Sequence, residues 1–137
     1  MQQVSLCFLI LLCTSWLLPS CTSEKKPPPL TEEEYSKSTQ MMLDITGKFL
    51  NETDIKRLHS AAVATQQARV VSCSNFNDEC SIYGKFVSLV IDSSKDSVIS
   101  SAEKRTLFEK REALKEAIKA GKEKLRSDWK IYKNQTK

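Results

Sequence analysis

Cys73 and Cys80 are the residues of the chain whose type and spacing point most directly to chemistry. Six residues separate them, whereas the redox pairs of oxidoreductases are usually separated by two. Two cysteines and the single histidine of the chain are also too few for a structural zinc site. In an oxidising compartment such a pair forms a disulfide. The sequence therefore predicts a Cys73–Cys80 disulfide that closes a short loop, provided that the chain is exported.

Export is indicated by the first twenty residues, which contain no charged side chain and are almost wholly apolar from Val4 to Leu18. An apolar stretch of this length is shorter than the roughly twenty residues of a spanning helix and is typical of a secretory signal. We therefore interpret residues 1–20 as a signal peptide. Cys7 and Cys13 lie within it.

The signal ends in Leu18-Pro19-Ser20-Cys21. This segment resembles the bacterial lipobox, in which a leucine and a small residue precede a cysteine that becomes acylated and then N-terminal. The resemblance implies a lipoprotein precursor with lipidation at Cys21, held at a cell membrane or outer membrane and facing the periplasm or the surface. Pro19 and the absence of Lys or Arg before the apolar stretch depart from the pattern. Ordinary cleavage after Thr22 or Ser23 is the alternative, and it predicts a secreted chain.

Positive charge is concentrated in the last part of the chain. Residues 21–100 carry nine Lys or Arg against eleven Asp or Glu, whereas residues 101–137 carry twelve against six. A candidate basic binding face for anionic lipid or polysaccharide consists of Arg111, Lys115, Lys119, Lys122, Arg126 and Lys130. The competing interpretation is a solvated helix face with pairs such as Glu112–Lys115 and Glu116–Lys119. Nucleic acid is not expected as a partner, because the chain is exported and this helix lacks interleaved aromatic residues.

Motifs of catalysis are missing from the sequence. It contains no glycine-rich phosphate loop and no HExxH, and its one histidine, His59, lies beside an apolar helix face. We interpret His59 as a partly buried structural residue. The chain is therefore predicted not to be an enzyme, and to need no cofactor and no metal.

The elements that must position these residues are helices. Residues 21–30 contain three consecutive prolines and predict an extended tether. Thr31-Glu32-Glu33-Glu34 and Ser100-Ser101-Ala102-Glu103 are capping boxes that begin helices over 31–50 and 101–133. A second helix begins at a cap, Asn51 or Thr53. Residues 73–80 are expected to be a loop, and 92–96 a turn.

The segment 81–91 is ambiguous, because Phe86 to Ile91 has strand propensity. Tyr83, Phe86, Val87 and Val90 have helical spacing, however, and no second strand exists to pair with them. We therefore predict a helix here. The fold class is then all-α: residues 31–137 form a bundle of about four helices with one disulfide. That disulfide is expected to join the end of one helix to the start of the next, and the long amphipathic C-terminal helix is roughly 50 Å long.

These features predict a membrane-anchored envelope lipoprotein that binds another protein without catalysis, of the exclusion, immunity or assembly-accessory type. One alternative is a secreted eukaryotic helical glycoprotein or toxin-like ligand, whose glycosylation sites would be Asn51 and Asn134. The other is binding of anionic lipid or polysaccharide through the basic helix. That alternative predicts association that weakens steeply with salt and with neutralisation of Lys115, Lys119, Lys122 and Lys130.

Overall fold

The computed structural model describes residues 26–69, 71, 73 and 76–137. They form four helices and, within the described ranges, no strand. In chain order these are α2 (Glu32–Asn51), α3 (Ile55–Ala68), α4 (Asn77–Ser94) and α5 (Ser101–Gln135). The small all-α bundle and its Cys73–Cys80 disulfide are confirmed. The predicted signal peptide and Cys21 lie outside the described residues.

Both predicted capping boxes are present. The Thr31 hydroxyl accepts from the backbone N–H of Glu34, and the Glu34 carboxylate accepts from the backbone N–H of Thr31. Ser100 and Glu103 repeat this arrangement at the start of α5. Each cap satisfies backbone donors that the first turn of a helix leaves unpaired. Hydrogen bonds from Thr31 to the ionised carboxylate also hold the pKa of Glu34 below its ordinary value.

The predicted cap of the second helix was wrong. Asp54 caps α3, and its carboxylate accepts from the backbone N–H groups of Lys56 and Arg57 at 3.0 and 3.2 Å. Asn51 is instead the last residue of α2. Three residues of cap-forming type lie within four positions here, and α2 extends far enough to leave only Asp54 adjacent to the next helical turn.

The segment 81–91 is helical, as predicted, but α4 is longer than expected at both ends. It begins at Asn77, so Cys80 lies in its first turn and not in a loop, and it ends at Ser94, inside the expected turn 92–96. Ser94 is buried, and its hydroxyl donates to the carbonyl of Val90 at 2.6 Å. A serine that donates to the preceding turn has no unsatisfied group that would favour ending the helix earlier.

The core lies where α4 meets its neighbours. α4 packs against α3 on one side and α5 on the other, and α2 packs against both α5 and α4. Met42, Phe86, Val90 and Leu114 are fully buried at these contacts. Each such side chain stabilises the fold by roughly 1.5–3 kcal/mol through removal of apolar surface from water. Thr46 is also fully buried, and its hydroxyl donates to the carbonyl of Met42 at 2.9 Å.

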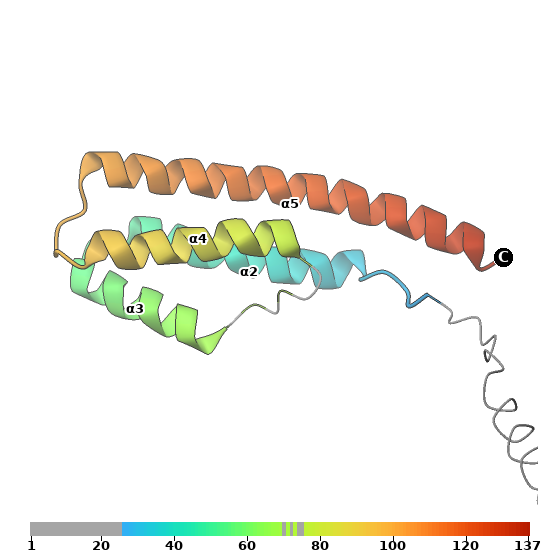
Figure 1. Ribbon diagram of the computed structural model, residues 1–137, viewed down its shortest axis with the longest axis horizontal. Helices are drawn as coiled ribbons and strands as arrows, with labels where there is room; N and C mark the ends of the chain where they lie inside the picture. Colours follow the sequence, from blue (N-terminus) through green and yellow to red (C-terminus); the bar gives the residue numbers. More distant parts are fainter. Residues whose placement is uncertain (1–25, 70, 72, 74–75) are drawn as a thin grey trace, which may run out of the picture.

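The last helix, α5, extends beyond the N-terminal end of α4 (Figure 1). Its first half lies along α2 and α4, whereas its second half continues past the first turn of α4 and then beyond the start of α2. The proline segment runs extended at this same end of the bundle, and its first residues are coloured blue in Figure 1. The N-terminal segment and the C-terminus therefore lie at one end, and the α4–α5 connection lies at the other.

Candidate functional site

The predicted basic face lies along one flank of α5, and α2 packs beside that flank. Lys122 Nζ and Arg126 Nη2 both bind Glu32 Oε1 of α2, at 3.2 and 2.7 Å. Lys115 pairs with Glu112 at 2.6 Å, as predicted. In the described chain Glu116 and Lys119 form no ion pair. Part of the predicted face is therefore engaged within the molecule itself.

Arg111 occupies a different environment from the rest of the predicted face. It reaches into the seam between α5 and α2, where Nε donates to the Thr46 hydroxyl and Nη2 to the carbonyl of Leu43, both at 3.3 Å. Gly47 of α2 makes room for this guanidinium, because a Cβ there would lie 3.0 Å from Nη2. Lys119 and Lys130 are exposed, without an ion-pair partner in the part of the chain that the structure describes.

Glu32 is the electrostatic centre of this flank. Hydrogen bonds from Arg126, and then from Lys122, hold the pKa of Glu32 at about 2. The same carboxylate raises the pKa of Arg126. Because all three side chains are substantially exposed, water and salt screen their attraction. We call the group Glu32, Lys122 and Arg126 the clasp.

Trp129 fastens the proline segment to the same part of α5. Its indole Nε1 donates to the carbonyl of Leu30 at 2.8 Å, and its ring packs edge-on against Tyr132, with 5.6 Å between ring centroids. Pro27 and Pro29 line a hollow of about 220 Å³ together with Ile131 and Tyr132. The described part of the predicted extended tether, from Lys26 to Leu30, is therefore held against α5.

A buried polar cluster lies beneath α5, one turn before the clasp. The Tyr35 hydroxyl lies 2.6 Å from Oε1 of Glu79 and 2.9 Å from the carbonyl oxygen of Ile118. Its single proton can be donated to either of these two acceptors. Both side chains are almost completely buried. Burial, and then the hydrogen bond to the Glu79 carboxylate, raises the pKa of Tyr35. The tyrosine is therefore neutral at physiological pH.

Gly121 makes this cluster sterically feasible. A Cβ at position 121 would collide with both Glu79 Oε1 and the Tyr35 hydroxyl. Glu79, Gly121 and neighbouring residues line a cavity of about 300 Å³. The cluster could not be found from the sequence, because its members come from α2, α4 and α5 and lie 44 and 83 positions apart. Gly121, a glycine inside a long helix, was the one local signal.

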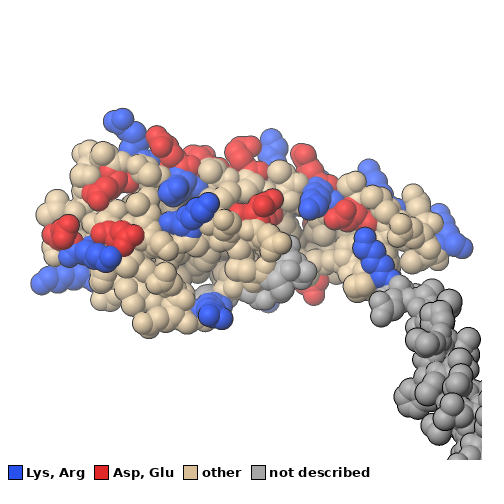
Figure 2. All heavy atoms as spheres, viewed as in Figure 1, with Lys and Arg blue, Asp and Glu red and all other residues tan. Residues whose placement is uncertain are grey.

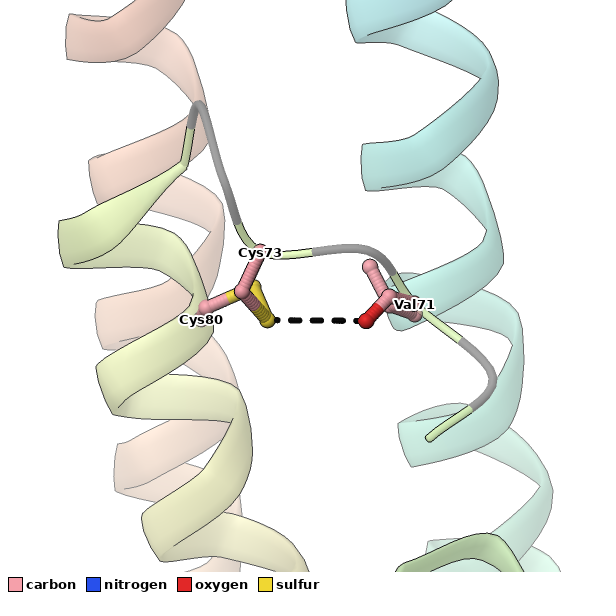
Figure 3. The surroundings of a disulfide bond; sticks show 3 residues. All are labelled: Val71, Cys73 and Cys80. Carbon is pink, nitrogen blue, oxygen red and sulfur yellow. Dashed lines mark hydrogen bonds between the residues drawn. A yellow bond between two sulfur atoms is a disulfide. The ribbon is translucent and has the colours of Figure 1, made fainter. Parts of the chain in front are cut away.

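The disulfide and the histidine have structural surroundings. Cys73 lies in the connection after α3, and Cys80 in the first turn of α4, with 5.8 Å between their Cα atoms (Figure 3). The bond therefore joins a loop to a helix start, not the end of α3 to α4 as predicted. Sγ of Cys73 approaches the carbonyl of Val71 at 3.6 Å, a van der Waals contact because disulfide sulfur has no proton to donate. The closed loop contributes roughly 2–3 kcal/mol by chain entropy.

His59 is half-buried, and its Nδ1 lies 2.9 Å from the hydroxyl of Ser94. That hydroxyl already donates to Val90, so the histidine nitrogen must be the donor, and the proton lies on Nδ1. Within the described ranges no three His, Cys, Asp or Glu side chains are grouped to hold a metal. Nor does any helix of those ranges have the length and hydrophobicity to cross a membrane.

Charge is mixed over most of the surface shown in Figure 2, where basic and acidic side chains alternate along the bundle. Basic side chains lie around the place where the described chain begins and toward the carboxyl-terminal end of α5. Comparison with known proteins gives no match to any family model, curated protein or solved structure.

Proposed function

We propose that the chain is a membrane-anchored cell-envelope lipoprotein that acts as a non-catalytic, protein-binding factor of the exclusion, immunity or assembly-accessory type. The observation that carries this proposal is the attachment of the proline segment to α5. Trp129 bonds to Leu30, and the clasp bonds α5 to Glu32, so the start of the described chain is fastened to α5.

This attachment gives an anchor at Cys21 a mechanical role. A freely jointed tether would let the bundle adopt any orientation at the membrane. Because residues 26–30 pack against α5, the lipid end of the chain is tied to the clasp end of the bundle. The opposite end, with the α4–α5 connection, then points away from the membrane.

The membrane-distal end carries exposed apolar side chains suited to a protein partner. Val98, in the α4–α5 connection, is 70% exposed, and Phe108, in the first turns of α5, is 55% exposed. An exposed aromatic residue costs free energy in water and commonly anchors a protein interface. The two features together, an oriented anchor and an apolar distal tip, support a binding role.

The anchor is tested by metabolic labelling with radioactive palmitate. Label is expected in the wild type and in Cys13→Ala, the matched control within the signal, but not in Cys21→Ala. An unlabelled wild type would contradict the lipoprotein assignment. Mass spectrometry of the mature chain separates the alternatives, because a diacylglyceryl Cys21 identifies the lipoprotein and a free N-terminus at Ser23 or Glu24 identifies the secreted chain.

The distal tip is tested with a photo-crosslinking amino acid placed at position 108, and at Lys85 of α4 as an exposed control. A discrete protein adduct is expected at position 108 alone. It should disappear when Cys21→Ala releases the chain from its membrane. Equal adducts at both positions, or none at 108, would show that the tip does not bind the partner.

A further inference from the structure

We propose that the carboxyl-terminal end of α5 rests against an anionic lipid surface, with Trp129 close to the lipid headgroups. The inference deepens the proposed function and rests on it for the position of the anchor. The surface is defined as the basic end of α5. It consists of Lys122, Lys124, Arg126, Lys130, Lys133 and Lys137.

The basic end carries an uncompensated charge. Residues 122–137 hold six Lys or Arg against two Asp or Glu, whereas residues 101–121 hold six against four. Glu32 neutralises part of the difference through Lys122 and Arg126. The other four lysines are exposed and form no ion pair with another described residue. An anionic surface would supply the missing counter-charge.

The basic end also provides a recess for anionic headgroups. A hollow of about 360 Å³ is lined by Leu125, Arg126, Trp129, Lys130, Lys133 and Glu32. Lys122 and Arg126 already neutralise the Glu32 carboxylate. Lys and Arg extend their charged ends to phosphate while their alkyl stems cover apolar surface. Trp and Tyr prefer the boundary between headgroups and acyl chains, where one part of the ring is apolar and another is polar. Trp129 and Tyr132 supply such rings beside the cations.

The proline segment brings the basic end of α5 to the membrane, and not the opposite end of the bundle. Lys26 lies with Tyr132 and Gln135 around one hollow, so the described chain begins at the basic end. Four residues, 22–25, lie between Cys21 and Lys26. Whatever their conformation, they span at most about 18 Å. A lipid attached to Cys21 therefore keeps Lys26, which lies beside the basic end, within about 18 Å of the headgroups. The cations themselves need no acyl chain to bind the headgroups.

The experiment uses the processed chain from position 21 with Cys21→Ser, which cannot be acylated. Its binding is measured by cosedimentation with vesicles of phosphatidylglycerol and phosphatidylcholine, or of phosphatidylcholine alone. A lysine near an anionic surface contributes roughly fivefold to partitioning. Lys130→Gln/Lys133→Gln/Lys137→Gln should therefore weaken binding to the anionic vesicles about a hundredfold. The matched control, Lys48→Gln/Lys104→Gln/Arg105→Gln, removes the same charge from exposed positions outside the basic end and should weaken it less than fivefold.

Fluorescence locates the contact, because Trp16 lies in the signal and Trp129 is the only tryptophan of the processed chain. A headgroup-labelled quencher lipid should quench Trp129 in the wild type. Equal losses in the two triple variants, equal binding to neutral vesicles, or binding without quenching would each overturn the proposal. Palmitate labelling is independent of all these lysines, so failure here is distinct from failure of the anchor.

Discussion

The two halves of α5 are held to the bundle by different kinds of interaction. Leu107 and Leu114 of the first half are buried between α2 and α4, and Arg111 spans the seam to reach Leu43 and Thr46. The second half has α2 and the proline segment beside it, and it depends on Leu125, Trp129 and the clasp. The first half therefore depends mainly on apolar burial, whereas the second half depends on one buried leucine and on exposed polar contacts that water and salt can weaken.

The largest difference should come from removing one leucine from each half. Leu114→Ala leaves a cavity in a fully enclosed site and should lower the free energy of unfolding by about 3–4 kcal/mol. Leu125→Ala, at the edge of the core, should cost about 2 kcal/mol because water and neighbouring side chains can fill the space. Urea unfolding of the two variants measures both values. Equal losses would contradict the division between the halves.

The junction of the halves is tested at Gly121. Gly121→Ala gains helix propensity but collides with the Tyr35–Glu79 cluster, and a net loss of about 2 kcal/mol is expected. Gly84→Ala is the matched control, because a Cβ there meets open space within the same kind of element. It should stabilise the protein by about 0.5–1 kcal/mol. Opposite signs in thermal unfolding confirm the steric role of position 121, and a stabilising Gly121→Ala would disprove it.

A smaller effect is expected at Trp129. Trp129→Phe retains a ring but loses the hydrogen bond to Leu30, which should cost about 1 kcal/mol. Hydrogen exchange should become faster in the last turns of α5 and near Leu30, but not around Leu114. Tyr132→Phe keeps the ring packing and should change stability by less than about 0.5 kcal/mol. Uniform acceleration across α5 would mean that the two halves unfold as one unit.

The smallest effect should come from the clasp, and it depends on pH. The pKa of Glu32 is about 2 in the folded protein and near 4.5 when unpaired. Its stabilising contribution is thus present above pH 4.5 and is lost as the pH falls from 4.5 toward 2. Glu32→Gln should therefore flatten the stability profile in that window and remove part of its salt dependence. A carboxyl NMR titration of Glu32 near its ordinary pKa would show that the clasp does not form in solution.

Local signals in the sequence predicted much of this fold. Both capping boxes depend on residues three positions apart, so they could be identified without knowing the fold. The helical nature of 81–91 followed from the lack of a partner strand. The cap at Asp54 could not be chosen among neighbouring candidates, because that choice depends on where α2 ends.

The candidate site was predicted less completely. Charge counting located the basic helix but could not show that Lys122 and Arg126 bind Glu32, or that Arg111 is drawn into the seam. The cluster of Tyr35 and Glu79 was invisible because only the packing of three helices brings its members together. Spacing along the chain reports on one helix face, whereas these contacts depend on how helices cross.

The contacts that close the bundle join residues far apart in the sequence, and this affects when the chain can fold during synthesis and translocation. Leu30 bonds to a residue 99 positions later, Glu32 to one 94 positions later and Tyr35 to one 83 positions later. During synthesis α2 therefore cannot complete its contacts until α5 has emerged from the ribosome. Long-range closure of this kind delays folding. A chain that cannot finish its domain early remains threadable, which is the state that a narrow export channel requires.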